Sequence, residues 1–297
     1  QGLRFTQAYT AGAVCSPTRG SIITGNVPPR TGVTHSIPAL SSAGRKLVTK
    51  PTNKQLALEE VTVAEALREG GYQTVYAGKW HLGGKGFEPQ DQGFEVVIPD
   101  QRDAQDWQGG QRLSKSAMEF LDERDVKRPF FMFLGYHEPH TPILEYPDHI
   151  AKFRDKAAKL SAGALPRRER DGQTRTLQND PAYASEVAGL DSFVGSVLDK
   201  LDRGGLAENT IVIFFSDNGG LSTKADAGPT SNEPLRAGKG WLYEGGIRVP
   251  LIVRSPGLTS AGSTTDTPVI STDFYPTLLS LAGLALKPEQ HRDGLDI

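Results

Sequence analysis

Residues 62–83, TVAEALREGGYQTVYAGKWHLG, decide the fold class of this chain. Thr62 and Glu65 form a capping-box pattern, which predicts a helix that begins after Thr62 and ends at the following glycine pair. The β-branched and aromatic run at 72–77 predicts a short buried strand. A polar segment, GKWHLG at 78–83, follows that strand directly. A helix, a buried strand and a polar loop in this order are typical of an α/β layer structure.

Helix and strand signals continue to alternate along the rest of the chain. Apolar strands are predicted at residues 130–134, 210–215 and 249–253. Helices are predicted around residues 117–121, from the Asp180-Pro181 cap to Leu201, and at residues 274–284. Apolar strands that alternate with amphipathic helices predict an α/β fold with a mostly parallel central sheet and helices on both faces.

The composition excludes several classes of protein. The 297 residues are 37% hydrophobic and 23% charged, which suits a chain with a sizeable core and excludes a disordered or fibrous one. The net charge of −2 provides no basic field, so no nucleic-acid partner is predicted. The longest apolar runs are too short to span a bilayer, so no transmembrane segment is predicted. The single cysteine, Cys15, excludes an internal disulfide framework and a cysteine-built zinc site.

Polar residues follow three of the predicted strands at the point where each strand ends. The candidate side chains are Lys79 and His81 after the first strand, His137 and His140 after the second, and Asp217 and Asn218 after the third. In an open parallel sheet, ligands bind outside the carboxyl ends of the strands. We therefore expect these side chains to converge at one edge of the sheet.

Each of these residues, taken alone, also has a purely structural interpretation. A histidine after a strand is often a hydrogen-bonded structural residue, and Asp217-Asn218-Gly-Gly is also typical of a simple turn. Lys79 alone would be a surface lysine, and a lone cysteine is usually a small buried hydrophobic residue. The prediction of a site depends on three polar segments at the same edge of the sheet.

A further candidate segment is VCSPTRG at residues 14–20. Pro17 and the apolar residues that follow predict a loop that runs into the N-terminus of a helix. Free N–H groups and a partial positive charge make such a helix end a binding place for an anion. Arg19 adds a planar, permanently charged donor that suits a tetrahedral oxyanion.

Together these segments resemble the sulfatase family, the formylglycine-dependent, arylsulfatase-like branch of the alkaline phosphatase superfamily. Cys15-Ser16-Pro17-Thr18-Arg19 resembles the family signature Cys-x-Pro-Ser/Thr-Arg. Other family segments are matched in the family's order by GKWHLG at 78–83, HTP at 140–142, DNG at 217–219 and GKGWLYEGGIRVP at 238–250. The resemblance covers nearly the whole chain. It implies an alkaline-phosphatase-like fold and a sulfuric ester hydrolase.

The resemblance also implies roles for the matched residues. Cys15 would be converted to Cα-formylglycine by a formylglycine-generating or anaerobic maturation enzyme, and the hydrated aldehyde would attack the sulfur of the substrate. Arg19 would hold the formylglycine. A calcium ion would be bound by Asp217, Asn218 and the modified Cys15.

The remaining implied roles concern the substrate. Lys79 and Lys239 would contact the sulfate oxygens, and His81 would be the base of a later elimination step. His140, which also contacts the substrate, would stabilise the departing alkoxide with Lys239. The family pattern places its essential histidine directly before x-Pro, so His140 is expected to be catalytic rather than His137.

Two parts of the family pattern do not occur in these 297 residues. The family's first strand ends in an Asp-Asp pair that supplies calcium ligands, and a smaller C-terminal sheet subdomain follows its catalytic domain. We therefore expect residues 1–297 to be a sulfatase catalytic domain truncated at both ends, with an incomplete calcium site and little activity alone. For the full-length parent, the resemblance implies export to the periplasm, the lysosome or the medium.

Residues 145–180 are polar, rich in Lys and Arg, and without a clear period. They predict a solvated surface insertion within the domain, and the alternative is a cap over a site that binds anionic substrates. Trp80 and Trp241 lie beside family segments and either stack on a sugar ring or pack in the core. Structural pairing is predicted for Glu244, Arg248 and Asp273.

Three functions are compatible with this sequence. The first is hydrolysis of carbohydrate or aryl sulfate monoesters by a Cα-formylglycine nucleophile and calcium. The second is a phosphonate monoester or phosphodiester hydrolase of the same superfamily. The third is a non-catalytic binder of sulfated glycans that has kept the fold. The intact signature at Cys15–Arg19 favours an enzyme, because a binder has no need of the modification motif.

Overall fold

The computed structural model describes residues 2–38, 52–103, 105–160 and 164–297. Its longer helices are α1 (Cys15–Thr24), α3 (Val63–Glu69), α4 (Gly109–Glu123), α5 (Pro147–Ala158), α6 (Pro181–Arg203) and α8 (Phe274–Leu281). Single turns form α2 (Pro28–Thr31), α7 (Glu244–Ile247) and the 3-10 helices η1 (Pro89–Gln92), η2 (Ala207–Asn209) and η3 (Ser271–Asp273). Across these four ranges we find no helix with the length and hydrophobicity that a membrane crossing requires.

The strands of the described residues form four sheets. In the first, β4 (Val96–Ile98), β3 (Gln73–Gly78) and β5 (Phe130–Gly135) pair in that order and all run parallel. The second has the order β11 (Thr264–Thr265), β1 (Leu3–Phe5), β10 (Leu251–Arg254), β8 (Val212–Phe215). The two small sheets pair β12 (Val269–Ile270) with β2 (Ala8–Tyr9), and β6 (Arg167–Glu169) with β7 (Gly172–Thr174) and β9 (Thr223–Lys224).

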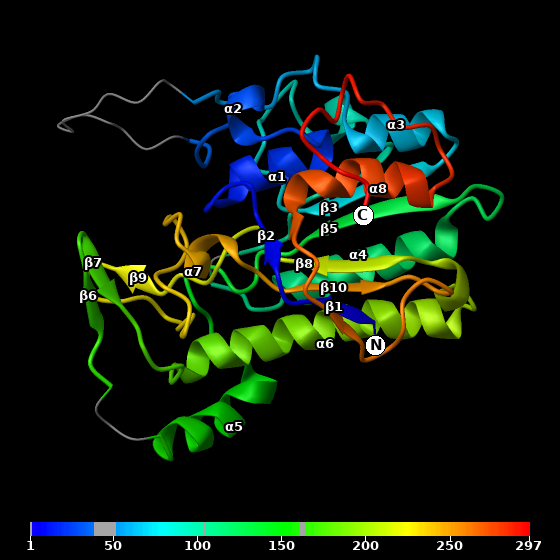
Figure 1. Ribbon diagram of the computed structural model, residues 1–297. Coiled ribbons are helices and arrows are strands. Elements are labelled where there is room, and N and C mark those ends of the chain that lie inside the picture. Colours follow the sequence, from blue (N-terminus) through cyan, green and yellow to red (C-terminus); the bar gives the residue numbers. More distant parts are fainter. Residues whose placement is uncertain (1, 39–51, 104, 161–163) are drawn as a thin grey trace.

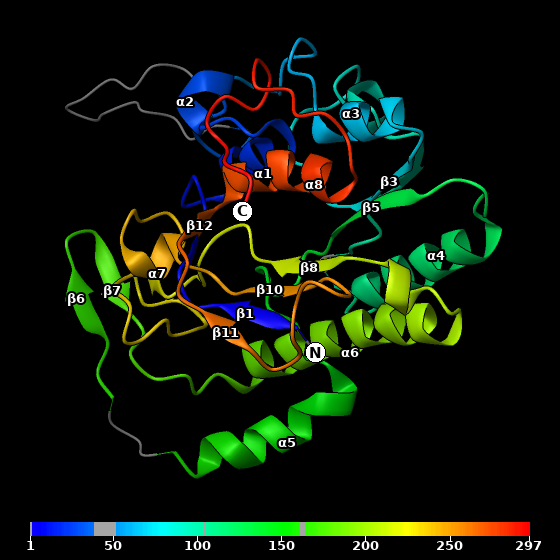
Figure 2. The same ribbon diagram turned by 45° about the vertical axis from the view of Figure 1, so that its right-hand side comes forward.

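Helices cover both faces of the two larger sheets, as Figures 1 and 2 show. Helices α1, α3 and α8 lie on one face, and α4 and α6 lie on the other. The main core lies beneath the first group of helices, and its fully buried members include Ile23, Leu67, Tyr76, Tyr275 and Leu279. Alternate residues of both sheets pack against this core, namely Phe131 and Phe133 from β5 and Ile213 and Phe215 from β8. The two sheets therefore share one core.

The predicted fold class is confirmed. The capping box of α3 is present, because the Glu65 backbone N donates to Thr62 Oγ1 (3.2 Å) and the Thr62 backbone N donates to Glu65 Oε2 (2.7 Å). Helix α6 begins after Asp180, whose side chain accepts from the backbone N of Tyr183 (3.1 Å). The sheet is mixed rather than wholly parallel, since β10 runs antiparallel to β1 and β8.

Three predicted boundaries differ from the structure. Helix α8 ends at Leu281 rather than at residue 284, because Gly283 has a left-handed backbone conformation (φ 68°). The strand predicted at 249–253 begins at Leu251, after Pro250, which has no N–H for a sheet hydrogen bond. The strand predicted at 210–215 begins at Val212.

Residues 145–180 contain secondary structure that the sequence analysis did not predict. Helix α5 packs against α6, and β6 and β7 form a hairpin whose second strand pairs with β9. Glu169, the last residue of β6, is buried and forms an ion pair with Arg236 (2.8 Å). This segment is therefore a folded surface element tied to the loop that carries Lys239.

Candidate active site

Cys15 is the first residue of α1, and its side chain is 2% exposed. Its N-cap is Val14, and Pro17 lies in the first turn, so the predicted loop that runs into a helix N-terminus is present. The first N–H groups of a helix have no partner within the helix, and their partial positive charge favours an anion at this end. The fold thus places the sulfur where a thiolate or an oxyanion is stabilised.

Four side chains from three other segments surround the Cys15 sulfur. Lys79 Nζ donates to Sγ (3.3 Å), and Sγ lies 3.5 Å from Asn218 Oδ1. The imidazoles of His140 and His81 also lie near the thiol and favour its ionised form. Burial is the largest single influence on the thiol and opposes its ionisation. The two histidines and Lys79 together outweigh burial, and the pKa of Cys15 falls to about 4.

Arg19 is buried beneath this cluster, at 6% exposure. Its Nε donates to Asp217 Oδ2 (2.9 Å), and its Nη1 donates to the Lys79 carbonyl (2.5 Å) and to the Tyr76 hydroxyl (3.1 Å). Burial opposes the charge of Arg19, but Tyr76, Asp217 and Cys15 raise its pKa above the ordinary value. Arg19 therefore ties helix α1 to the ends of β3 and β8.

Lys79 and Lys239 supply the other cations of the site. Lys79 is 8% exposed, and burial, with the charges of Arg19 and Lys239, lowers its pKa. Lys239 lies within electrostatic reach of Lys79 and Asp217, and its backbone N donates to the Gly220 carbonyl (3.1 Å). Three cations thus face one carboxylate, Asp217, which makes the site attractive to an anion.

His81 has an unusual backbone conformation for a residue with a side chain, with φ at 62°. Its Nε2 hydrogen-bonds to the Ile37 carbonyl, and its buried Nδ1 has no hydrogen-bond partner within the part of the chain that the structure describes. A strained backbone position together with a buried, unused nitrogen is typical of a functional residue.

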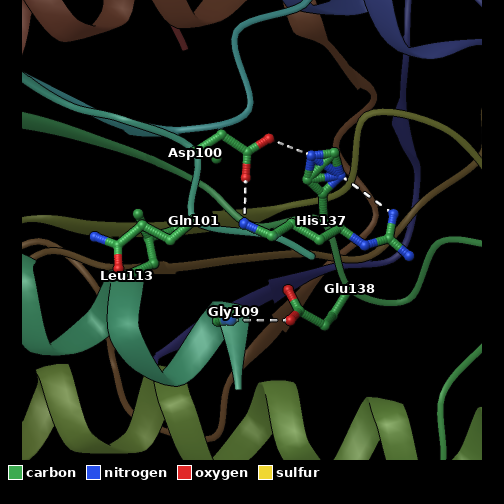
Figure 3. A pocket seen from close by; sticks show the side chains of 9 residues that line it. Asp100, Gln101, Gly109, Leu113, His137 and Glu138 are labelled. Atoms are coloured by element: carbon green, nitrogen blue, oxygen red, sulfur yellow. Dashed lines mark hydrogen bonds and ion pairs between the residues drawn. The ribbon is translucent and has the colours of Figure 1, made fainter. Parts of the chain in front are cut away.

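His140 lies in the loop that follows β5, and its Nδ1 is 2.8 Å from the Thr141 carbonyl. A carbonyl only accepts hydrogen bonds, so Nδ1 carries a proton, and the other nitrogen, Nε2, is the one left to act in the site. His137, three residues earlier, instead contacts Asp100 through Nε2 (2.5 Å), as Figure 3 shows. Burial and nearby cations, Lys79 first among them, lower the pKa of His137 to about 2.

The residues implied as calcium ligands meet only part of what calcium requires. Asp217 and Asn218 follow β8 directly, and Asn218 Oδ1 lies beside the Cys15 sulfur. Oxygen donors of these types suit calcium, which takes about 6–8 oxygens. One Asp217 oxygen is already bonded to Arg19, and the described residues contain no group of three or more His, Cys, Asp or Glu arranged for a metal. This ligand set alone does not complete a calcium site.

Two tryptophans and three charged residues named from the sequence have mainly structural surroundings. Trp80 packs in the core and donates from Nε1 to the Phe87 carbonyl (2.8 Å), whereas Trp241 is partly exposed and stacks on Tyr243. Arg248 pairs with Glu244 (3.0 Å). Asp273 accepts from the backbone N of Ile270 (2.8 Å) and of Leu295 (2.9 Å), and among the described residues it forms no ion pair.

Three residues near the site were not predicted from the sequence, namely Tyr76, Asp100 and Arg102. Tyr76 was assigned only to a strand, yet its hydroxyl contacts both Arg19 and the Lys79 carbonyl. Asp100 and Arg102 follow β4 in the same way that the predicted site residues follow β3, β5 and β8. Applying the strand-end rule to the short apolar run Val96–Ile98 would have identified them.

Comparison with known proteins decides the family. The family model described as Sulfatase matches residues 1–284. The chain belongs to the sulfatase family. Arylsulfatase A of Homo sapiens is 32% identical to this sulfatase-family chain, in an alignment that covers 100% of the chain and 60% of the human protein. Arylsulfatase G of Canis lupus familiaris is 30% identical, with the same two coverages of 100% and 60%.

Solved structures agree with the fold. The crystal structure of Ps i-CgsB matches with a TM-score of 0.80 and 27% identity, over 99% of this sulfatase-family chain and 67% of that chain. The chain spans about 60% of the length of the arylsulfatases that it matches.

Proposed function

We propose that the protein hydrolyses sulfate monoesters through a Cα-formylglycine made from Cys15. The observation that carries this proposal is the surroundings of the Cys15 sulfur. Lys79, His81, His140 and Asn218 reach it from three segments, at the N-terminus of a helix. A residue that served only to fill the core would not need two imidazoles and an ammonium group around it.

The reaction that we propose explains why Cys15 would be converted to an aldehyde. One hydroxyl of the hydrated aldehyde attacks sulfur, and the bond between sulfur and the alcohol oxygen breaks. His140 gives a proton to the departing alkoxide or stabilises it, assisted by Lys239. The enzyme is then left as a sulfate ester of the geminal diol.

His81 serves the second half of the reaction. It removes the proton from the remaining hydroxyl, the carbon–oxygen bond to sulfate breaks, and the aldehyde returns and is hydrated again. A serine in place of the diol would leave a sulfate ester that could be released only by a second attack at sulfur. The buried and unused Nδ1 of His81 supports this role.

The cations of the site suit the charge of the reaction. A sulfate monoester is an anion, and negative charge spreads over its oxygens in the transition state. Preorganised cations are the most effective stabilisers of such charge. Lys79 and Lys239 would contact sulfate oxygens, which their mutual proximity to Asp217 supports. Arg19 would hold helix α1 and Asp217 in fixed relative positions.

Calcium, when bound, would polarise the sulfate and help to acidify the nucleophile. Asp217 and Asn218 would hold it together with the modified Cys15. We propose that the remaining ligands come from a strand outside residues 1–297 that lies between β5 and β8. In the described sheets, β5 and β8 are both edge strands, and Figures 1 and 2 place them side by side without pairing. Both apolar strands stay partly exposed, whereas β3, which has a neighbour on each side, is buried.

The substrate class that we propose is a carbohydrate sulfate or an aryl sulfate. Ps i-CgsB has been solved in complex with k-i-k-neocarrahexaose. Another solved relative of the same fold, 20% identical, is in complex with its substrate D-glucosamine-2-N,6-O-disulfate. A partly exposed Trp241, two residues from Lys239, is consistent with stacking on a sugar ring.

Two further parts of the proposal follow from the family. A formylglycine-generating or anaerobic maturation enzyme would act on Cys15 before the protein folds, because the folded chain buries the signature almost completely. The mature protein would be exported to the periplasm, the lysosome or the medium.

The test compares matched esters with the intact protein co-expressed with a maturation enzyme. We expect release of sulfate from p-nitrophenyl sulfate, far slower turnover of bis-p-nitrophenyl phosphate, and loss of both activities in Cys15→Ala. Faster turnover of the phosphodiester would contradict the proposed reaction. Binding of a sulfated glycan with no turnover of either ester would indicate a non-catalytic binder instead.

A further inference from the structure

Arg102 holds the loop that carries His140. Its Nη2 donates to the carbonyls of His140 (2.7 Å) and Pro142 (3.1 Å), and its Nη1 donates to the carbonyl of Thr141 (3.4 Å). One guanidinium thus contacts three consecutive carbonyls. Residues 137–142 form no backbone–backbone hydrogen bond within the described part of the chain. The contacts with Arg102 therefore supply fixed geometry that the loop's own backbone does not.

The position of the imidazole depends on the same contacts. The Thr141 carbonyl accepts from Arg102 and from His140 Nδ1 (2.8 Å), so both side chains share one acceptor. With Nδ1 bonded to that carbonyl, Nε2 is the ring nitrogen left to act in the site, where His140 already influences the Cys15 thiol. Loss of the guanidinium would free the Thr141 carbonyl to move, and the imidazole bonded to it would move as well.

Arg102 is itself held by a second set of contacts. Asp100 accepts from the Arg102 backbone N (3.1 Å) and from His137 Nε2 (2.5 Å). His137 Nδ1, which then has no proton, lies 3.4 Å from Arg102 Nη1 and accepts from it. Figure 3 shows Asp100 directed at His137 beside the pocket that Glu138 and Gly109 also line.

We propose that Arg102 is a positioning residue for His140, with Asp100 and His137 holding the guanidinium in place. This inference rests on the proposed function, in which His140 assists departure of the alkoxide. It assigns a structural role to the other histidine of this loop, His137. Arg102 itself contacts no reacting atom, so it acts only through His140.

The experiment uses two small esters that differ in the need for a proton on the leaving group. Phenolate leaves less readily than p-nitrophenolate, so phenyl sulfate needs the help of His140 more than p-nitrophenyl sulfate does. We expect Arg102→Gln to lower kcat for phenyl sulfate by about 10–100-fold, with a much smaller loss for p-nitrophenyl sulfate and little change in KM. Arg102→Lys keeps the charge but not the three-way contact, and is expected to fall between wild type and Arg102→Gln.

Arg128→Gln is the matched control. Arg128 also donates to backbone carbonyls, those of Gly71 (3.1 Å) and Tyr72 (2.7 Å), but it lies at the opposite end of β5. We expect it to turn over both esters as wild type does. Equal losses for both esters in both Arg102 variants, or no loss in either, would overturn the proposal.

A spectroscopic measurement separates this inference from the proposed function. In nitrogen-15-labelled protein, the signals of His140, assigned with His140→Gln, should show a proton held on Nδ1 in wild type and in Arg128→Gln. In Arg102→Gln the Nδ1 signal should move toward that of a nitrogen that is protonated only part of the time. If wild type hydrolyses neither ester, the proposed function fails, and these signals alone decide the role of Arg102. Unchanged His140 signals in Arg102→Gln would overturn it.

Discussion

At the scale of single residues, the site combines burial with charge. Cys15, Arg19 and Lys79 are each less than a tenth exposed, yet all three have partners that favour their charged forms. Burying a charge without such partners would cost several kcal/mol or more. The pairing of Arg19 with Asp217, Tyr76 and the Lys79 carbonyl therefore matters for both stability and chemistry.

Tyr76 can be tested through its hydroxyl alone. Tyr76→Phe removes a partner from both Arg19 and the Lys79 carbonyl, and we expect the free energy of unfolding to fall by about 1–2 kcal/mol. We also expect slower release of sulfate, because Lys79 and Arg19 lose a fixed contact. The measurements are denaturant unfolding and ester turnover. In the control Tyr275→Phe, which removes another buried hydroxyl that contacts the Thr62 carbonyl (3.4 Å), turnover should be unchanged. Equal effects in both variants would contradict this role for Tyr76.

Glu186 makes stability depend on pH. It is 2% exposed, and burial, followed by the charge of Glu138, raises its pKa to about 8. A folded pKa above the unfolded value means that the folded state binds more protons, so stability is lost as pH rises from about 5 to 8.

Glu186→Gln should remove this loss of stability at higher pH, because glutamine does not ionise. Relative to the variant, wild type should become less stable by roughly 2–4 kcal/mol between about pH 5 and pH 8, as denaturant unfolding would show. The exposed Glu208→Gln serves as the control and should follow wild type at each pH. A constant difference between wild type and Glu186→Gln across this range would contradict the shifted pKa.

At the scale of elements, the ends of three strands could be predicted from sequence. Lys79, His140 and Asp217 each follow an apolar run, and parallel strands bring such residues to one edge. The direction of β10 could not be predicted, because an apolar strand of four residues has the same pattern whichever way it runs. Arg102 was missed because the short run Val96–Ile98 was not recognised as a strand, and its contacts with backbone carbonyls could not be predicted from side chains.

Helix α3 tests how well local signals account for an element. Thr62 caps the helix and also donates from Oγ1 to the buried Gln92 carbonyl (2.7 Å). Thr62→Ala removes both contacts and is expected to cost about 1–3 kcal/mol of unfolding free energy, measured with denaturant. Thr62→Ser keeps the hydroxyl and should cost less. A loss as large in Thr62→Ser would assign the effect to the methyl group instead.

At the scale of the whole molecule, one core supports two sheets whose facing edges, β5 and β8, are unpaired in the described chain. The family relationship and the site depend on segments from residue 15 to residue 239, so most of the chain contributes to one small region. Sequence motifs identified these segments. The distances and hydrogen-bond partners within the site could be obtained only from the structure. The contacts of Arg19 with Asp217 and Tyr76 are the clearest example.

Calcium binding belongs to this scale as well. Asp217 and Asn218 alone offer few of the oxygens that calcium takes, so residues 1–297 should bind calcium weakly by calorimetry. The intact protein should bind it much more tightly, and Asp217→Ala should remove that gain. Equally tight binding by residues 1–297 would show that these residues complete the site themselves.

The central claim is that Cys15 becomes the nucleophile. Its most direct test is mass spectrometry of the peptide that contains Cys15, from the intact protein co-expressed with a maturation enzyme, alongside a sulfate-release assay of the same preparation. We predict an aldehyde or its hydrate in place of the thiol, in a fraction that rises in step with the rate of sulfate release. An unmodified thiol in every preparation, with no sulfate released, would contradict it.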